Sequence, residues 1–402
     1  MNLNFFIGFY IYNSWFFFDS IYLLEIDKTL YIIAYRYNNF KDGDFMKVNH
    51  GANLYDLSIE LGFSKNDFMD FSSNINPLGA SSNAKNHVIN NIDSISIYPD
   101  PSYFDLKGAI STYCNCSSDN IILGNGATEL ISSFIKTLRP QKSLLLSPVY
   151  SEFESELRKI NSSIIKFFHD KSKNFTVDIN DLIDILNKDK YDLLVICNPN
   201  NPTGFAFTNL EIKKLLESTS TYVMIDETYI EFTDMNKYSA TSLVDEFDNL
   251  FVIRGTSKFF STPGIRLGYS LLSNRDLFDK ISSKFDLWNI NILASMMGEV
   301  MFLDNDFIDN SFDFVTNERD YLVDELSKFD DFYVYNTHGN FILCEIKSRK
   351  FTSNTLREFL LTKKIIIRDC SSFDGLDEYF FRVCVLSSDA NRYLIECINN
   401  FI

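Results

Sequence analysis

The segment SKFFSTPGIRLGY (257–269) places a lysine and an arginine, Lys258 and Arg266, directly after the apolar run LFVIRGT (250–256). A lysine is seldom left beside a buried strand unless its amine is used, because burying an ammonium group is costly. An amine in apolar surroundings is a nucleophile that binds carbonyl groups, and a nearby arginine binds anions. The segment therefore suggests a site for a carbonyl compound that carries an anionic group.

Two other apolar runs with the character of strands also end in polar turns. NIILG (120–124) leads into the turn 126–128, where a helix is predicted to begin. Free backbone N–H groups at such a position bind phosphate. YDLLVICN (191–198) leads into NPNNPTG (198–204), whose two prolines and glycine fix a rigid turn that can aim Asn201 into a cleft.

A third run, YVMIDE (222–227), ends in a carboxylate, Asp226, and is followed by Tyr229. A carboxylate at the end of a buried strand is costly unless a cationic or proton-sharing partner lies beside it. In an open α/β sheet, functional groups gather where the strands end at their carboxyl edge. These turns are therefore expected to meet at one site.

Each feature alone also has a structural explanation, such as a solvated lysine or a rigid turn. Together they are the parts needed to hold an aromatic aldehyde phosphate, and pyridoxal 5'-phosphate is the cofactor that needs all of them. Lys258 would bind the aldehyde covalently, Asp226 would hold a protonated ring nitrogen, and Asn201 and Tyr229 would bond the ring hydroxyl. The predicted phosphate ligands are Gly126, Ala127, Thr128, Ser257 and Arg266.

NPNNPTG, DETYIEF and SKFFSTPGIRLGY, in this order, resemble the class I/II aminotransferase superfamily, the fold-type I pyridoxal-phosphate enzymes. The resemblance covers roughly residues 46–402. It implies an α/β fold, with a large domain built on a mostly parallel seven-stranded sheet between helices and a smaller α+β domain. It also implies a homodimer with shared active sites. In that family the tyrosine of SIYPDPSYF, here Tyr98, reaches the partner's cofactor phosphate, and the aromatic residue of SPVYSEF, here Tyr150, stacks on the ring.

The pattern along the chain agrees with this fold. Continuous apolar strands that alternate with helices are typical of a parallel sheet covered on both faces. Helices are expected at 104–114, 125–138, 151–160 and within 291–328, and strands at 120–124, 143–147, 191–198, 222–227, 250–255, 266–273, 331–337, 340–346, 363–370 and 379–387. The predicted domains are an atypical extension (1–45), a segment that joins the small domain (46–95), a large cofactor-binding domain (96–290) and a small C-terminal domain (291–402).

Three segments indicate the reaction. Residues 49–81, 287–300 and 365–387 are similar to threonine-phosphate decarboxylases of cobalamin biosynthesis. The resemblance assigns substrate contacts to His50, Asn74, Arg368 and Arg382. Paired arginines suit a substrate with both a carboxylate and a phosphate. The expected activity is decarboxylation of O-phospho-L-threonine to (R)-1-aminopropan-2-yl phosphate.

Two positions depart from that pattern. Ala52 replaces the second glycine of an H-G-G-N start, and Tyr229 stands where some of these decarboxylases have phenylalanine and histidinol-phosphate aminotransferases have tyrosine. A histidinol-phosphate aminotransferase, or a related pyridoxal-phosphate aminotransferase, therefore remains the alternative. A regulator built on this fold would carry a DNA-binding module, but residues 1–45 lack a basic helix pair.

Composition narrows the partners and the compartment. A net charge of −17 argues against nucleic acid and anionic membranes. The seven cysteines and four histidines show no metal-site spacing, so no metal is expected, and the cysteines favour a reduced, cytoplasmic protein. The aromatic-rich residues 1–45 lack the positive start of a signal peptide, and polar residues interrupt any spanning stretch. We hypothesise that Met46 is the natural start.

Overall fold

The computed structural model describes residues 9–11, 14–16 and 54–402. The chain divides into two compact units, residues 1–49 and 50–402. In the first unit, β1 (Phe9–Ile11) and β2 (Ser14–Phe16) form an antiparallel hairpin. The rest of the predicted extension, the proposed start at Met46 and the candidate ligand His50 lie outside the described residues. They stay predictions.

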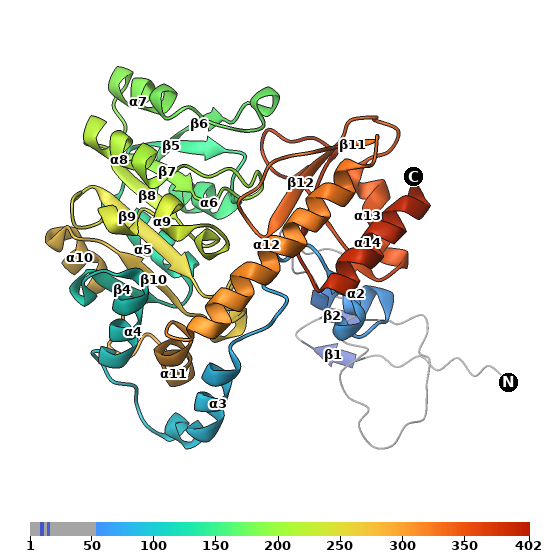
Figure 1. The fold of residues 1–402 in the computed structure, drawn as a ribbon. Helices are drawn as coiled ribbons and strands as arrows, with labels where there is room; N and C mark the ends of the chain where they lie inside the picture. The colour runs from blue at the N-terminus through green and yellow to red at the C-terminus, as the bar shows by residue number, and fades with distance from the viewer. Residues whose placement is uncertain (1–8, 12–13, 17–53) are drawn as a thin grey trace. The chain divides into compact units, whose positions relative to one another are not determined.

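A seven-stranded sheet forms the centre of the second unit (Figure 1). Its strand order is β4-β10-β9-β8-β7-β5-β6, and within it β10 runs antiparallel to both of its neighbours while the other neighbouring pairs are parallel. The mostly parallel seven-stranded sheet of the prediction is therefore confirmed. The strands are β4 (Ile121–Gly124), β5 (Lys142–Ser147), β6 (Ser163–Phe168), β7 (Leu193–Cys197), β8 (Tyr222–Asp226), β9 (Leu250–Gly255) and β10 (Gly268–Leu271).

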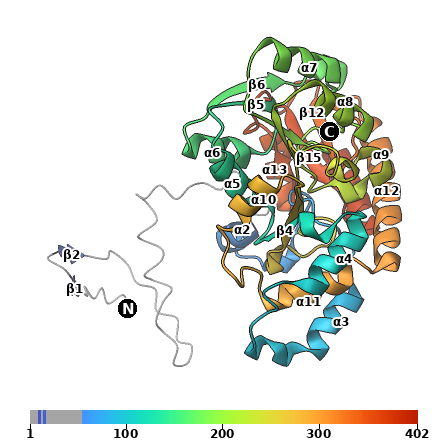
Figure 2. The ribbon, with the colours of Figure 1, turned by 90° about the vertical axis from the view of Figure 1, so that its left-hand side faces the viewer.

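Helices cover both faces of this sheet, because alternate side chains of each strand point to opposite sides. In β8, Val223 and Ile225 belong to the larger hydrophobic cluster, together with residues of α7 and α8, whereas Met224 belongs to a second cluster with residues of α5, α6 and α10. The helices of the large domain are α4 (Phe104–Cys114), α5 (Ala127–Leu138), α6 (Ser151–Lys159), α7 (Ile179–Lys188), α8 (Asn209–Ser218), α9 (Met235–Tyr238) and α10 (Arg275–Ser282). α3 (Ser82–Asn90) and α11 (Ile292–Met301) pack side by side next to α4 (Figure 2).

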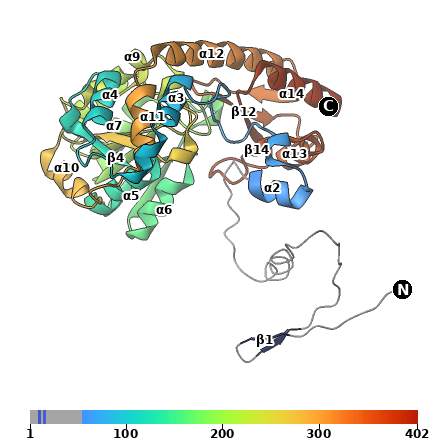
Figure 3. The same cartoon turned by 90° about the horizontal axis from the view of Figure 1, so that it is seen from below.

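The small domain is built on an antiparallel four-stranded sheet of order β11-β12-β15-β14. The long helix α12 (Asn305–Ser327) runs from the large domain to this sheet (Figure 1). α2 (Leu54–Leu61) lies beside α13 (Figure 3), and Leu57 of α2 and Leu361 of α13 belong to one small hydrophobic cluster. The remaining elements are β11 (Phe332–Val334), β12 (Phe341–Ile346), α13 (Ser353–Thr362), β14 (Arg368–Asp369), β15 (Phe380–Cys384) and α14 (Ser388–Phe401).

The strand expected at 363–370 is two strands. β13 (Ile365–Ile366) pairs in parallel with β3 (Met69–Asp70), whereas β14 pairs antiparallel with β15. The chain changes from one sheet to the other at Ile367, which no apolar pattern could reveal. The β3–β13 pair joins residues 69–70 to residues 365–366. The predicted domains and their boundaries stay predictions.

Two further findings concern the cysteines and the apolar character of the helices. All seven cysteines are free thiols. Among the described residues, none of the helices combines the length and the apolar character that a membrane span needs.

Candidate active site

A cavity of about 300 Å³ lies at the carboxyl ends of the central strands and reaches the small domain. Eleven of the predicted site residues line it: Ala127, Thr128, Tyr150, Asn201, Asp226, Tyr229, Ser257, Lys258, Arg266, Arg368 and Arg382. Residues from turns far apart in the sequence therefore meet at one site, as the strand-end argument expects.

Lys258 lies three residues after the end of β9 and projects into this cavity. Its Nζ donates a hydrogen bond of 2.6 Å to the backbone carbonyl of Ser73. Burial, with a smaller contribution from the nearby Arg382 guanidinium, lowers the pKa of Lys258 to about 8, since both disfavour the ammonium form. A lysine with this pKa is partly neutral near pH 8, which is the form that attacks an aldehyde.

Asp226 is the last residue of β8 and is 5% exposed. Its Oδ1 accepts hydrogen bonds from the backbone N–H of Thr228, at 2.9 Å, and from the Thr228 hydroxyl. Burial raises the pKa of Asp226. A buried carboxylate of this kind is stabilised by a cationic partner in the cavity, and a protonated pyridine nitrogen would supply that charge.

Tyr229 and Asn201 also line the cavity, and both are buried. The Tyr229 hydroxyl accepts a 3.2 Å hydrogen bond from Nδ2 of Asn74. Oδ1 of Asn201 accepts from Nη1 of Arg382, whose Nη2 donates to the carbonyl of Ser72 at 2.7 Å. Burial raises the pKa of the Tyr229 phenol, so that it stays protonated as a hydrogen-bond donor. Oδ1 of Asn74 and Nε of Arg382 are buried without a hydrogen-bond partner. Arg382 lines the cavity, whereas Asn74 is not among its lining residues.

The predicted phosphate ligands lie together at the N-terminus of α5. Gly126 has φ +80°, and a Cβ atom there would lie 2.5 Å from Nη2 of Arg266. Arg266 also donates a 3.4 Å hydrogen bond to the carbonyl of Asn125, and Ser257 lines the same cavity. The start of a helix beside an arginine is suited to a phosphate dianion. The donor set therefore fits pyridoxal 5'-phosphate, from the amine at one end to the phosphate turn at the other.

The second predicted arginine, Arg368, is in β14 and lines the small-domain side of the cavity. It donates to the Ser372 hydroxyl at 2.7 Å, and its guanidinium lies 5.3 Å from the centroid of the Phe373 ring. Two arginines on different strands of one sheet, Arg368 paired in register with Arg382, thus approach the cavity from the side opposite the central sheet.

Two tyrosines were predicted to contact the cofactor. Tyr150, at the start of α6, lines the cavity, and burial raises its pKa to about 12. Tyr98 does not line it: the side chain is 74% exposed and stacks on Trp288 with ring centroids 4.4 Å apart. Its predicted role concerns a partner subunit and stays a prediction.

The structure adds residues that the sequence did not single out. Thr228 fixes the Asp226 carboxylate, and Ser72 and Ser73 contribute backbone carbonyls to Arg382 and Lys258. Residues 49–81 resemble the decarboxylase pattern, but that resemblance assigned substrate contacts only to His50 and Asn74. A backbone carbonyl carries no side-chain signal, so these contacts could not be predicted from residue types.

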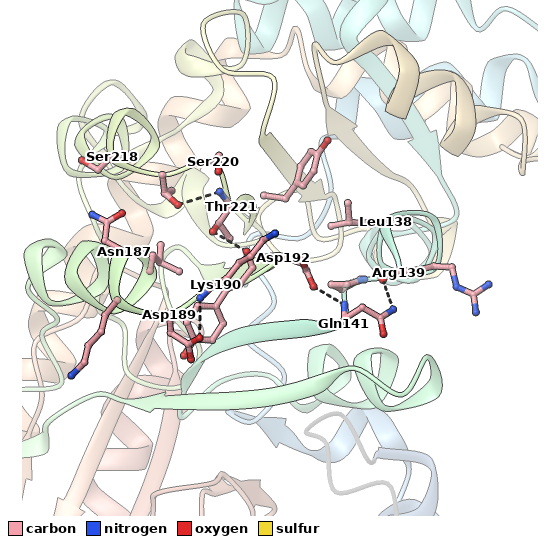
Figure 4. Close-up of a pocket in the computed structure, with 16 residues that line it drawn as sticks. Leu138, Arg139, Gln141, Asn187, Asp189, Lys190, Asp192, Ser218, Ser220 and Thr221 are labelled. Atoms are coloured by element: carbon pink, nitrogen blue, oxygen red, sulfur yellow. Dashed lines mark hydrogen bonds between the residues drawn. The ribbon is translucent and has the colours of Figure 1, made fainter.

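A larger hollow of about 710 Å³ lies at the opposite edge of the sheet, where β5, β7 and β8 begin (Figure 4). None of the predicted site residues lines it. One carboxylate oxygen of Asp192 accepts hydrogen bonds from the backbone N–H groups of Gln141 and Lys142, at 2.8 and 3.0 Å. This carboxylate stabilises the backbone of the neighbouring loop, so we do not take the hollow as a second candidate active site.

Comparison of the sequence and the structure with known proteins identifies the family of the chain. The family model described as "Aminotransferase class I and II" matches residues 61–398. The chain belongs to this family. It is an enzyme of the pyridoxal-phosphate-dependent aminotransferase-like superfamily, and its cofactor is pyridoxal 5'-phosphate.

Relatives with two different activities resemble the chain. It is 37% identical over 363 residues to a Caldanaerobacter subterraneus protein named "Putative threonine-phosphate decarboxylase", covering 89% of this chain and 95% of the relative. It is 29% identical to a histidinol-phosphate aminotransferase of Methanosphaera stadtmanae, covering 88% and 95%. The crystal structure of the histidinol-phosphate aminotransferase from Clostridium acetobutylicum matches with a TM-score of 0.77 and 32% identity, covering 82% of this chain and 98% of that chain.

Proposed function

We propose that the protein catalyses the pyridoxal-phosphate-dependent decarboxylation of O-phospho-L-threonine to (R)-1-aminopropan-2-yl phosphate, a step of cobalamin biosynthesis. The observation that carries the proposal is the pair Arg368 and Arg382 on the same cavity as Lys258. A substrate with a carboxylate and a phosphate brings two anionic groups, and two guanidinium groups match them. The 37% identity to the Caldanaerobacter protein supports the same reading.

In this reaction the residues of the site would have the following roles. Bound pyridoxal 5'-phosphate would supply an electron sink for the α-carbon of the substrate. Asp226 keeps the ring nitrogen protonated, and the arginines with Asn74 and His50 orient the substrate so that the bond to the carboxylate breaks. Lys258 or a nearby group would then return a proton to the α-carbon. Because tight pairing of the carboxylate would oppose its loss, we expect its contacts to be weaker than those of the substrate phosphate.

The histidinol-phosphate aminotransferase reading is the second candidate. Tyr229 and the similarity to two aminotransferases favour it. The two activities differ in their products: decarboxylation releases carbon dioxide without an amino acceptor, whereas transamination converts 2-oxoglutarate to glutamate.

The test measures both products from one enzyme preparation. Purified protein with pyridoxal 5'-phosphate is incubated with O-phospho-L-threonine, O-phospho-L-serine or histidinol phosphate, each with and without 2-oxoglutarate. We expect carbon dioxide from phosphothreonine that is independent of 2-oxoglutarate. Glutamate formation from histidinol phosphate, with no carbon dioxide from the phosphorylated amino acids, would replace the proposal with the second candidate.

We also propose that the protein is a cytoplasmic homodimer with shared active sites. Several large apolar side chains near Tyr98 and Trp288 in the sequence are exposed, which supports a surface that a partner covers. They are Ile89, Ile92, Ile95, Ile97, Phe104 and Leu287. Such a group of exposed apolar residues is typical of protein interfaces. Light scattering after size-exclusion chromatography tests this, and a monomer at micromolar concentration would contradict it.

A further inference from the structure

Residues 70–74 form a tight turn that the side chain of Asp70 closes. Oδ1 of Asp70 accepts hydrogen bonds from the backbone N–H of Ser72 at 2.9 Å and from the Ser72 hydroxyl at 2.5 Å. This is the aspartate turn in which a carboxylate bonds the backbone two residues on. Asn74 ends the turn with φ +56°.

The turn presents two successive carbonyl groups to two cationic groups of the site. The Ser72 carbonyl accepts from Nη2 of Arg382 at 2.7 Å, and the Ser73 carbonyl accepts from Nζ of Lys258 at 2.6 Å. One peptide segment therefore touches the lysine on the cofactor side and the arginine on the substrate side. The directions of the two carbonyls depend on the turn.

Both ends of the segment are held by backbone hydrogen bonds. Phe71 donates to the carbonyl of Ile366 at 2.8 Å and accepts from the N–H of Cys384 at 2.9 Å, both in the small domain. Asn76 donates to the carbonyl of Lys258 at 2.9 Å. Between these ends, the Asp70–Ser72 contacts and a 3.0 Å hydrogen bond from Nδ2 of Asn340 to the carbonyl of Asn74 hold the conformation.

The second carboxylate oxygen of Asp70 argues for a role beyond stability. Oδ2 is buried without a hydrogen-bond partner, and this lowers the free energy of unfolding. A contribution to stability alone therefore does not explain an aspartate at this position.

We propose that Asp70 is a positioning residue that closes the 70–74 turn, so that the Ser72 and Ser73 carbonyls hold Arg382 and Lys258 at the cavity. This inference rests on the cofactor and substrate roles given to these two residues above. It adds a residue that touches neither cofactor nor substrate and acts through the turn.

The experiment separates the turn from the charge. Asp70→Asn keeps an oxygen that can accept from Ser72 but removes the charge, whereas Asp70→Glu keeps the charge but is too long for the turn. Asp70→Ala removes both. Asp170→Ala is the matched control, because Asp170 accepts from the N–H and hydroxyl of Ser172 in the same way, at 2.8 and 2.7 Å, on the surface.

The readout is the dissociation constant of pyridoxal 5'-phosphate for each apoprotein, titrated by the absorbance of the lysine-bound cofactor. We expect D70A and D70E to bind roughly tenfold more weakly, as for the loss of one or two hydrogen bonds, and D70N and D170A to stay within about threefold of wild type. Circular dichroism and thermal unfolding check that each apoprotein folds, and the D70E/D70N pair carries the test if D70A does not.

Wild-type affinity in D70E, or a loss in D70N equal to that in D70E, would overturn the proposal, as would the same loss in D170A. Cofactor binding does not depend on which substrate is used. A wrong assignment of the reaction would therefore leave this result intact, and the two failures are distinguishable.

Discussion

The two edges of the central sheet differ in what their polar groups do. At the carboxyl edge, a cavity of about 300 Å³ holds buried charged groups, and Asn74 Oδ1 and Arg382 Nε lack hydrogen-bond partners. At the amino edge, a hollow of about 710 Å³ is lined by groups that are exposed or bonded to neighbouring backbone, such as Asp192. The larger hollow thus has fewer polar groups suited to binding or catalysis. Burial and unmet hydrogen bonds identify a site better than volume does.

Replacing Lys258 by alanine tests the carboxyl edge most directly. The variant should lose the yellow absorbance of the lysine-bound cofactor and all measurable turnover, because no other lysine of the described residues lines the cavity. Absorbance spectra of the dialysed protein, with and without added cofactor, provide the measurement. Retained absorbance after dialysis would refute the assignment of Lys258.

Asp226→Asn should bind the cofactor but lower kcat by roughly 100- to 1,000-fold. An amide cannot stabilise the positive ring nitrogen as a carboxylate does, and electrostatic groups of this kind are worth that much. Steady-state kinetics at saturating cofactor measure the effect. Wild-type kcat in D226N would show that the buried carboxylate is structural.

Arg382→Lys should raise KM for the phosphorylated substrate by roughly 30-fold. This corresponds to about 2 kcal/mol of binding free energy, the lower end of what is lost when a buried, hydrogen-bonded charge pair is broken. Lysine keeps the charge but cannot reproduce the planar pair of contacts with Asn201 and Ser72. The cofactor absorbance should persist. An unchanged KM would remove Arg382 from the substrate site and leave Arg368 as the arginine to test.

The rate of cofactor attachment to apoprotein should rise with pH and level off above about pH 8. The pKa of Lys258 is lowered from its ordinary value to about 8, and the neutral amine is the reactive form. Below pH 8 the neutral fraction, and with it the rate, should fall about tenfold per pH unit. Stopped-flow absorbance gives the profile. A midpoint near 10 would mean that burial does not shift this lysine.

Asp189→Ala at the amino edge should change little. Its partner is Lys142, and the pair is exposed to solvent, which screens it. We expect kcat/KM within twofold of wild type and a change in Tm below about 2 °C. A large loss of activity would contradict the view that chemistry is confined to the carboxyl edge.

The cofactor half of the site was readable from the sequence because its side chains directly follow apolar strands. The run LFVIRG is β9, with the predicted bounds, and Lys258 follows it into the cavity. β6 was not identified from the sequence, because its residues alternate between partly buried and exposed rather than forming a buried run. It lies at the edge of the sheet, where one side has no neighbouring strand.

The substrate half was less predictable, because its contacts are long-range and pass through backbone. Arg368 and Arg382 were assigned by resemblance, and the structure brings both to the cavity. The hydrogen bonds from Lys258 and Arg382 to the carbonyls of Ser73 and Ser72 join residues separated by 185 and 310 positions, and serine side chains play no part in them. Only tertiary structure brings such groups together.

The reversed direction of β10 bears on the order of assembly. β9 ends at Gly255, which is paired with Gly268 at the start of β10, so the connection between these two strands carries Ser257, Lys258 and Arg266. The amine and two of the predicted phosphate ligands thus belong to a single local loop between sequential strands. Closing a short loop costs less entropy than forming the parallel crossovers elsewhere in the sheet. This part of the site can therefore take shape early in folding, before the distant strands that complete the cavity have paired.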